Sequence, residues 1–413
     1  MERHFISATG FWLALIFPAS AQQVPFPQHV RYTAQTIKPA VVQGALDQTT
    51  ADFYDAWRAH YLVNGCATNQ FYVHYSADWT PELTNAISVS EGHGYGMVIT
   101  ALMAGHDPAA RIYFDGLFRF YTNHPSRLTP GLMGWQQVSP DCAAAPDGYD
   151  SATDGDLDIA YALLLADRQW GSDGQINYLV EAKKTIAAVM RGEINREIWS
   201  VRLGDWATPD DKKFYYGTRP SDFMMDHFHA FQHATEDTNW SRVTDECYRV
   251  IAQIQSRFSP QTGLLPDFAV RLDTAPAPAA GHYLESRNDG DFGYNACRVP
   301  WRLATDFLIS GDNRALVALN KMNGWIQTQT AGDPAKINAG YRLATGKNLG
   351  HDTSLAFTAP FAVSAMVNPT NQIWLDKLWR HVASRKIGED SYFGNSIKMI
   401  CLIVLSGNWW TPQ

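Results

Sequence analysis

Apolar residues recur at intervals of three and four along most of this chain, and almost no segment alternates in the manner of an exposed strand. An interval of 3.6 residues is the period of one helix face, whereas alternation is the period of a strand. The pattern therefore predicts an all-α protein with hardly any strand. The twelve expected helices span 49–62, 91–104, 108–122, 154–168, 175–192, 220–234, 238–257, 295–309, 312–328, 350–366, 371–386 and 391–405.

From the second helix onward, a helix rich in small and apolar residues is followed by a more amphipathic one across a short polar turn. In these turns Gly can adopt the left-handed conformation that ends a helix, and Asp, Asn or Thr can cap the next one. The pattern predicts a series of helical hairpins. Their turns are 105–108, 171–174, 235–238, 310–313 and 368–371.

The connections between successive hairpins are long and rich in Gly, Pro and aromatic residues. Short turns at one end and long loops at the other place all the long loops on one face. Twelve alternating helices then close most simply into an (α/α)6 barrel of six helical hairpins, with the apolar helices inside. Long loops in a compact domain are usually functional, so we expect the site on that face. The long loops are 63–90, 123–153, 193–219, 258–294 and 329–349.

The N-terminus has the features of a secretory signal peptide. Arg3 and His4 precede an apolar run at 11–17, and Ala19-Ser20-Ala21 offers a small-residue cleavage site. The run is too short to span a bilayer. We therefore expect residues 1–21 to be a signal peptide, residues 22–413 to form a single catalytic domain, and the product to be a soluble secreted protein, extracellular or periplasmic.

Five cysteines are too few for a disulfide scaffold, and their odd number leaves at least one unpaired. Cys66 and Cys142 lie in polar loop segments and could pair in an oxidising compartment. Five buried free thiols are the alternative.

The formal net charge is −8, without a basic run. Nucleic acids and anionic membranes reward clustered Lys and Arg, so we expect neither as a partner. An acidic surface would suit a cationic polymer, and it is also a common way to keep a protein soluble. The sequence has no P-loop, no Rossmann glycines after a strand and no H-E-x-x-H segment, so we expect no cofactor and no metal. We also expect a monomer.

The N-terminal ends of the expected inner helices carry polar residues, which the topology brings to one rim. Each has an ordinary alternative explanation, because carboxylates and Asn cap helices and favour helix N-termini. Together, with aromatic residues between them, they indicate a site, and two carboxyl groups are what glycosidic bond cleavage needs. His93 is expected to be a hydrogen-bonding residue. The rim residues are Glu91, Asp154, Asp156, Asp222, Asp226, Asn295, His351, Asp352 and Tyr392, of which we expect Asp222 and Tyr392 to contact substrate.

The segment 152–170, Ala-Thr-Asp-Gly-Asp-Leu-Asp-Ile-Ala-Tyr-Ala-Leu-Leu-Leu-Ala-Asp-Arg-Gln-Trp, resembles the signature of glycoside hydrolase family 8. Blocks at 90–97, 131–135, 204–206 and 294–302 agree with it, and the resemblance covers about residues 45–410. It implies an (α/α)6 barrel and an inverting endo-acting enzyme. The family's substrates are cellulose, mixed-linkage β-glucan, chitosan and xylan.

The resemblance also implies roles for individual residues. Glu91 matches the general acid, and Asp154 matches the aspartate that holds the sugar at the cleavage subsite. Arg298 matches a polar contact beside the base position. The aromatic platforms for sugar rings match Trp135, Trp206 and Tyr294.

One departure from the family pattern concerns the base. Many members have Asp where this chain has Asn295, and Asn cannot take a proton from water. A subgroup that resembles this arrangement supplies a Glu from the preceding loop, ten residues upstream, which is Glu285 here. That subgroup implies activity on chitosan, mixed-linkage β-glucan or β-1,4-glucan. The expected function is therefore a β-1,4-cleaving endo-hydrolase of chitosan, β-glucan or both, with Glu91 as acid and Glu285 as base.

Two other functions remain open at this stage. Helical barrels also carry lyases and epimerases, since a fold does not determine a function. Asn295 raises the alternative of a carbohydrate-binding relative with impaired catalysis. In addition, a helix N-terminus favours the ionised form of Glu91, so burial and the charge of Asp154 must outweigh it if Glu91 is to donate a proton.

Overall fold

The computed structural model describes residues 22–79 and 84–413. These residues are mostly helical, as predicted, and form 13 α-helices. The expected signal peptide, residues 1–21, lies outside the described residues.

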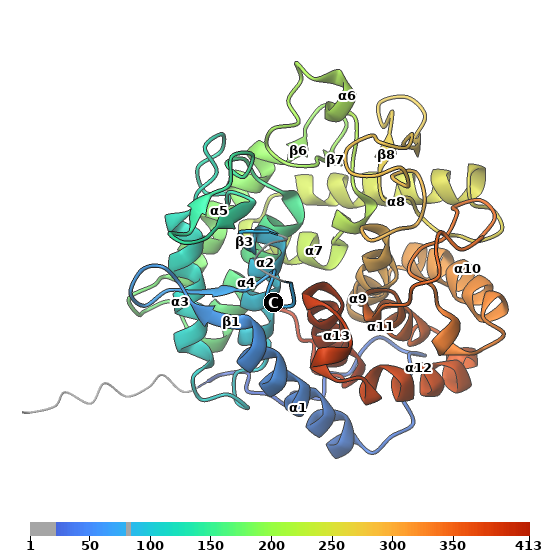
Figure 1. Ribbon diagram of the computed structural model, residues 1–413, viewed down its shortest axis with the longest axis horizontal. Helices are drawn as coiled ribbons and strands as arrows, with labels where there is room; N and C mark the ends of the chain where they lie inside the picture. Colours follow the sequence, from blue (N-terminus) through green and yellow to red (C-terminus); the bar gives the residue numbers. More distant parts are fainter. Residues whose placement is uncertain (1–21, 80–83) are drawn as a thin grey trace, which may run out of the picture.

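Six helices form an inner set around the centre of the molecule (Figure 1). Each packs against its neighbours in the set: α2 contacts α4, α4 contacts α7, α7 contacts α9, α9 contacts α11, α11 contacts α13, and α13 contacts α2. The contacts therefore close a ring. These helices are α2 (Ser90–Leu102), α4 (Thr153–Trp170), α7 (Met225–Thr235), α9 (Val299–Ser310), α11 (Leu355–Ala365) and α13 (Tyr392–Leu405).

A second set of helices surrounds the first (Figure 1). Each outer helix packs mainly on one inner helix: α1 on α13, α3 on α2, α5 on α4, α8 on α7, α10 on α9, and α12 on α11. The outer helices are α1 (Gln43–Tyr61), α3 (Ala110–Asn123), α5 (Tyr178–Gly192), α8 (Asn239–Arg257), α10 (Asn313–Gln329) and α12 (Gln372–Ser384).

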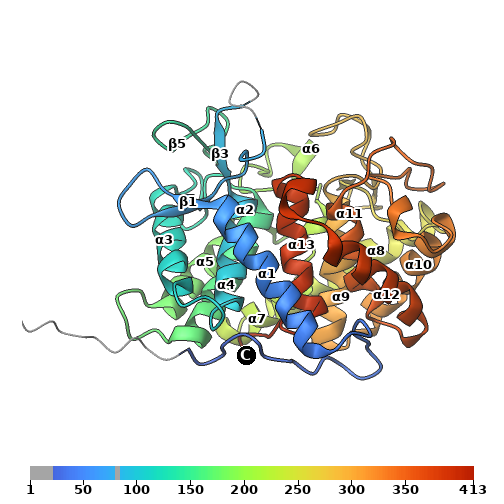
Figure 2. The same ribbon diagram turned by 60° about the horizontal axis from the view of Figure 1, so that its bottom comes forward.

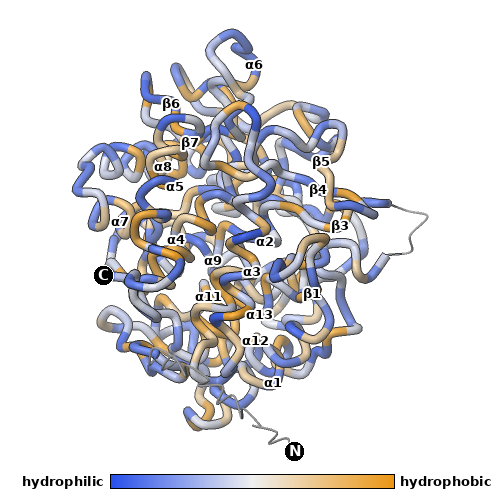
Figure 3. Tube along the Cα trace, turned by 90° about the vertical axis from the view of Figure 1, so that its left-hand side faces the viewer, coloured by the Kyte–Doolittle hydropathy of each residue, from blue (hydrophilic) through white to orange (hydrophobic). Residues whose placement is uncertain are grey.

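Burial differs between the two sets as the hydrophobic pattern predicts. In α4 every residue except Asp167 and Arg168 is buried, whereas the outer helix α8 buries nine of its 19 residues. A helix that is apolar all round belongs inside a core, and an amphipathic one belongs at its edge. In Figure 3 hydrophobic colour runs through the interior near α11 and α13.

The predicted turn chemistry is present at two short connections, one of them with its cap outside the predicted turn 171–174, whereas α3, α8 and α12 begin without a side-chain cap. Gly171 and Gly311 end α4 and α9 with φ of 72° and 73°, which side chains disfavour. Asp312 caps α10 by accepting from the N–H of Arg314, and Asn177 caps α5 by accepting from the N–H of Val180. Each of these two connections joins an inner helix to the outer helix that packs on it.

Several helices begin at other residues than predicted. α1 starts at Gln43, because Leu46 continues the buried face of Thr50 and Phe53. The predicted helix 220–234 is divided into a 3-10 turn, η1 (Pro220–Asp222), and α7.

The predicted helices 295–309 and 350–366 start late for tertiary reasons. Asn295 precedes the 3-10 turn η2 (Ala296–Arg298), which leads into α9. Residues 350–352 instead bond to the preceding loop, where Asp352 O accepts from the Ala339 N–H and Gly350 O from the Asn338 side chain. Ser354 then caps α11.

The long loops contain short strands, which the periodicity did not predict. Each is two to four residues long, and a segment that short carries no readable period. They pair in small antiparallel sheets, ordered β1-β2, β3-β4-β5, β6-β7 and β8-β9. The strands are β1 (Leu62–Asn64), β2 (Phe71–Val73), β3 (Ala86–Val89), β4 (Gln136–Val138), β5 (Ala143–Ala144), β6 (Ile194–Asn195), β7 (Ser200–Val201), β8 (Ala269–Val270) and β9 (Ala277–Pro278).

The loop strands gather on one face, as expected. Figure 2 shows β1, β3, β5 and the short helix α6 (Lys212–Tyr215) at one end of the helices, with the C-terminus at the other. Three further 3-10 turns lie in the connections: η3 (Pro334–Lys336), η4 (Pro369–Asn371) and η5 (Ile387–Glu389).

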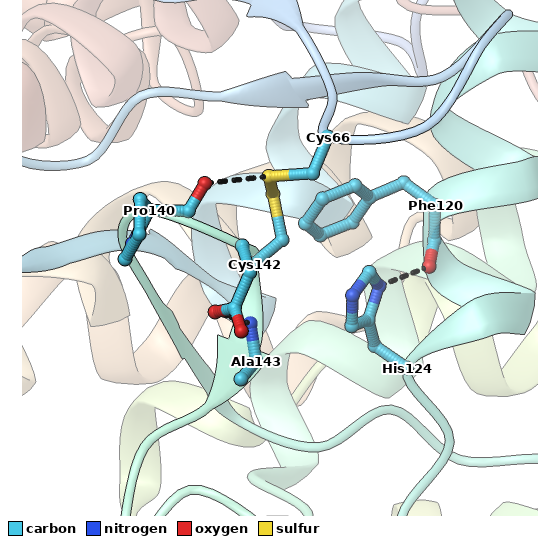
Figure 4. The surroundings of a disulfide bond; sticks show 7 residues. Cys66, Phe120, His124, Pro140, Cys142 and Ala143 are labelled. Atoms are coloured by element: carbon cyan, nitrogen blue, oxygen red, sulfur yellow. Dashed lines mark hydrogen bonds between the residues drawn. A yellow bond between two sulfur atoms is a disulfide. The ribbon is translucent and has the colours of Figure 1, made fainter.

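One disulfide joins two loops of this face. Cys66 and Cys142 are bonded, which decides between the two alternatives that the sequence left open, and they link the β1–β2 connection to the β4–β5 connection (Figure 4). Cys247, Cys297 and Cys401 are free and buried. Among the described residues, no helix is both long and apolar enough to span a bilayer.

Candidate active site

A cleft of about 570 Å³ opens on the loop face, over the N-termini of α2, α4 and α13. A second hollow of about 540 Å³ adjoins it and shares Trp135, Ala152, Arg219 and Glu285 with it. Together they make one elongated groove. The cleft is lined by Tyr75, Trp79, Val89, Ser90, Glu91, Trp135, Ala152, Asp154, Arg219, Glu285, Tyr294, Asn295, Ser391, Tyr392 and Phe393.

Glu91 lies in the first turn of α2, directly after β3, at the floor of the cleft. Its side chain is 18% exposed and accepts hydrogen bonds from Arg298 at 3.0 Å and from the Tyr392 hydroxyl at 3.5 Å. Burial raises the pKa of Glu91 to about 7; Arg298 opposes this shift and Asp154 adds to it. The carboxyl is therefore poised to hold a proton near neutral pH, which meets the requirement stated from the sequence.

Arg298 is the cation at the centre of the carboxyl cluster, and only 1% of its side chain is exposed. Its Nη1 donates to Glu91 and, at 2.6 Å, to Asp154. Its Nη2 donates to Ser221 Oγ at 2.9 Å and to Asn295 Oδ1 at 3.2 Å. Arg298 therefore lies beneath the cleft floor, orienting the polar side chains above it.

Asp154 opens α4 on the other side of Arg298. Burial acts to raise the pKa of Asp154, but Arg298 and Arg219, with hydrogen bonds from Arg298 and the Gly155 N–H, outweigh it and hold the pKa below its usual value. Glu91 and Asp154 thus share one guanidinium and differ in protonation, because the shorter and stronger contact goes to Asp154.

Glu285 comes from the loop between β9 and η2, and its side chain is 48% exposed. Arg219 donates to its Oε1 at 3.3 Å, and Asn295 Nδ2 donates to its Oε2 at 2.8 Å. The loop around it is held by the buried carboxylate of Asp289, which accepts from the N–H groups of residues 284, 285 and 286 at 2.8, 3.0 and 2.6 Å.

Asn295 connects the two sides of the site, because it accepts from Arg298 and donates to Glu285. Its turn is held by Asp267, whose Oδ1 accepts from the N–H groups of Gly293, Asn295 and Ala296. A Cβ at Gly293 would approach Asp267 Oδ2 to 2.3 Å, so only glycine fits beside that carboxylate.

The three predicted aromatic platforms all border the groove. Trp135 lines both hollows and donates its Nε1 hydrogen to Asp147 O at 2.6 Å. Trp206 lines the second hollow and packs edge-on against Phe214. Tyr294 is 52% exposed and meets Phe357 edge-on.

The other predicted site residues divide between the cleft and its support. Tyr392 lines the cleft beside Glu91, and a Cβ on Gly92 would approach its hydroxyl to 2.1 Å. Asp222 is fully buried and bonds to Arg219, so it supports that arginine and has no surface for a sugar. Among the other rim residues, His351 and Asp352 are exposed and do not line the cleft.

Several groove residues were missed from the sequence. Arg219 contacts both Asp222 and Glu285, and Trp79 is 43% exposed in the cleft next to Tyr75. Asp289 holds the loop that carries Glu285. They lie inside long loops without periodicity, and a lone Arg, Trp or Asp in a loop signals nothing by itself.

The arrangement suits acid and base chemistry on a bound polymer. One carboxyl can be protonated near neutral pH, and a second, solvent-exposed carboxyl lies in the same cleft. Aromatic side chains along the groove can stack on sugar rings, while an elongated shape accepts a chain rather than a single ring. The described residues include no cluster of three or more His, Cys, Asp or Glu able to hold a metal ion.

Comparison with known proteins agrees with this chemistry. The chain is 47% identical over 402 residues to a β-glucanase from Niallia circulans, covering 96% of this chain and 95% of that protein. It is 39% identical over 391 residues to an endoglucanase from Bacillus sp. strain KSM-330, covering 94% of this chain and 82% of that protein.

A solved structure is also similar. The apo β-1,3-1,4-glucanase from Paenibacillus sp. X4 superposes with a TM-score of 0.90 at 47% identity, covering 95% of this chain and 100% of the other. The sequence model of the glycosyl hydrolases family 8 matches residues 77–407, which hold every cleft residue named above except Tyr75. The chain therefore belongs to glycoside hydrolase family 8 and is a glycoside hydrolase.

Proposed function

We propose that this protein is an inverting endo-hydrolase that cleaves β-1,4 linkages in mixed-linkage β-1,3-1,4-glucan and cellulose. In this proposal the ring of helices is an (α/α)6 barrel of six helical hairpins, and residues 22–413 are its single catalytic domain. The observation that carries the mechanism is a mostly buried carboxyl with a pKa of about 7, Glu91, in one cleft with the half-exposed carboxyl of Glu285.

Glu91 acts as the general acid and gives its proton to the departing glycosidic oxygen. Glu285 acts as the general base and takes a proton from the water that attacks the anomeric carbon from the opposite side. Arg219 and Asn295 each hold one oxygen of Glu285, so the carboxylate is oriented although it lies on a loop. Asp154, paired with Arg298 at the cleft floor, holds the sugar at the cleavage subsite.

Room for the water requires a separation of roughly 6.5–9.5 Å between the two carboxyl groups, against about 5–5.5 Å in retaining enzymes. The first-formed anomer decides between the two. NMR of a fresh digest should show inversion, and retention of configuration would overturn the pairing of Glu91 with Glu285.

The choice of glucan rests on the relatives, which are named a β-glucanase, an endoglucanase and a β-1,3-1,4-glucanase. Chitosan is a second candidate, because Asp147 and Asp150 line the second hollow and carboxylates suit the amino groups of that polymer. The acidic net charge of −8 favours it as well.

We further propose that the protein is secreted and acts as a monomer. The N-terminal signal pattern supports export, and the disulfide between Cys66 and Cys142 suits an oxidising compartment.

The substrate experiment compares barley β-glucan, carboxymethylcellulose and chitosan side by side in a reducing-sugar assay. We expect the fastest release of reducing ends from β-glucan. Ultraviolet-absorbing products would identify a lyase instead. Binding to β-glucan without release of reducing ends would identify an impaired carbohydrate-binding relative.

A further inference from the structure

A second pair of carboxyl groups lies buried behind the groove, where the proposed mechanism does not use it. Asp156 is in the first turn of α4, two residues after Asp154, and Glu193 follows the end of α5. Both side chains have no solvent-exposed surface. Two ionised carboxylates cannot face each other in such a place without a compensating charge.

One oxygen of each carboxyl accepts a hydrogen bond from a neighbouring loop. Asp156 Oδ1 accepts from the Met133 N–H at 2.8 Å, and Glu193 Oε1 accepts from Ser151 Oγ at 2.6 Å. The other oxygens, Asp156 Oδ2 and Glu193 Oε2, have no donor among the described residues. A side-chain hydrogen bond between the two groups raises the pKa of Asp156 and lowers that of Glu193. A single proton between them would satisfy both free oxygens.

The surrounding charges favour keeping that proton. Asp205 and Asp154 face the pair as further negative groups, and Tyr121 faces Asp156. The nearby cation Arg202 directs its Nε and Nη2 hydrogens to the backbone carbonyls of Ala207 and Asp205. Burial, together with the facing carboxylates, raises the pKa of Glu193 to about 8 and that of Asp156 well above its ordinary value.

The pair is linked to both tryptophan platforms by hydrogen bonds to residues that lie close to each tryptophan in the sequence. On the Asp156 side, Met133 lies two residues before Trp135. On the Glu193 side, Ser151 Oγ accepts from the Asp205 N–H at 3.0 Å, and Ser151 N–H donates to Asp205 Oδ1 at 2.9 Å. Asp205 immediately precedes Trp206 in the sequence.

We propose that Asp156 and Glu193 share one proton and act as positioning residues that keep Trp135 and Trp206 in register for one sugar chain. The inference rests on the proposed function, since it assumes that these platforms bind β-glucan. Loss of the shared proton would place two negative charges together and separate the two loops, so sugar binding would weaken while the groups at the cleavage point stay in place.

Amide substitutions test the shared proton because an amide carries its own hydrogens. In Asp156→Asn or Glu193→Gln, the amide can still accept from its loop donor while its NH₂ donates to the remaining carboxylate. Each single variant therefore keeps the bridge without a shared proton. In the double variant two NH₂ groups face each other, and the bridge is lost. Glu181→Gln, on the surface of α5, is the matched control for the substitution itself.

Binding is measured by calorimetry with a β-1,4-linked glucose tetrasaccharide, in a Glu91→Gln background so that no cleavage occurs. Between pH 6 and 7 we expect both single variants to bind like their parent and the double variant to bind about tenfold more weakly. At a pH high enough to remove the last proton of the pair, the parent should weaken, while the single variants should not. A double variant that binds like the parent, or single variants as weak as the double, would overturn the proposal.

Stability against pH is a readout that needs no ligand. The pKa of Glu193 is raised in the folded state, so the stabilisation from its proton is fully present below the ordinary value of 4.5 and is lost as pH rises to about 8. Over that interval the melting temperature of the otherwise wild-type chain should fall more than that of Glu193→Gln. Equal declines would overturn the shared proton. If the tetrasaccharide fails to bind any variant while this difference is present, the proposed function fails and the pair stands.

Discussion

In the proposed mechanism, the acid side and the base side of the cleft achieve their chemistry by different means. Glu91 is in the first turn of a helix, mostly buried, and its protonation is controlled by burial against the charges of Arg298 and Asp154. Glu285 is on a loop and half exposed. Its orientation depends on Asn295, on Arg219 and on the hydrogen bonds from the backbone of its loop to Asp289.

The difference follows from what each role requires. A proton donor at neutral pH needs an environment that disfavours the charged form, and a buried site beside another carboxylate provides it. A base needs contact with water and a defined direction. An exposed loop provides the first, and hydrogen bonds to both carboxylate oxygens provide the second. The comparison therefore predicts that the acid side is sensitive to charge and the base side to geometry.

The largest expected effect comes from removing either reacting group. Glu91→Gln and Glu285→Gln should each lower kcat by about 10²–10⁴-fold, because each general acid or base contributes that much. Circular dichroism should show an unchanged fold, since neither change alters the core. If Glu285→Gln keeps near-normal activity while Asp154→Asn or Asp222→Asn abolishes it, the base lies elsewhere on the rim.

The next largest effect tests geometry on the base side. Asp289→Asn removes part of the acceptor that holds three N–H groups of the Glu285 loop, and misplacement of a reacting group by about 1 Å can cost 10²-fold. We expect a loss of about ten- to hundredfold in kcat with little change in KM.

Asp291→Asn is the matched control for that prediction. Asp291 is two residues away in the same loop but holds the Leu343 N–H and Arg342 instead of the Glu285 turn. It should leave kcat unchanged. Equal losses from both variants would mean that the loop is merely destabilised.

The third prediction tests charge on the acid side through the pH profile. The pKa of Glu91 is about 7, so kcat/KM should fall as pH rises above that value and the donor loses its proton. Asp154 raises this pKa, so Asp154→Asn should move the alkaline limb down by about one unit, which is tenfold at a fixed pH above it.

Asp222→Asn serves as the comparison for the pH profile, because Asp222 is also buried near Arg298 but is not among the main groups that shift the pKa of Glu91. It should leave the alkaline limb near its original pH. An alkaline limb that stays in place in Asp154→Asn would show that burial alone sets the protonation of Glu91.

The smallest expected effect concerns Asn295, the residue that links the two sides. Asn295→Ala removes the bond to Glu285 Oε2 but leaves the one from Arg219 to Oε1. Because Arg219 still holds Glu285, we expect a loss of about 1 kcal/mol, or about fivefold, which is smaller than for either glutamate. Steady-state kinetics on β-glucan checks it, and a loss as large as that of Glu285→Gln would make Asn295 part of the reacting machinery.

Local patterns in the sequence were sufficient for the helices and for part of the site. Apolar residues that recur every three or four positions predicted twelve helices, and the Gly and Asp turns predicted how the helices pair. Both patterns depend on residues that are close together in the chain. The blocks around Glu91 and at 152–170 pointed to the proposed acid side through the family resemblance, since each block is a continuous stretch of sequence that opens a helix.

The tertiary structure decided everything that depends on residues far apart. The late start of α11, the contact of Arg219 with Glu285 and the facing of Asp156 with Glu193 all join separate loops or helices. Protonation belongs to this second group as well. Burial sets the pKa of Glu91, and no pattern along the chain states how deeply a carboxyl is covered or which cation it meets once the ring of helices closes.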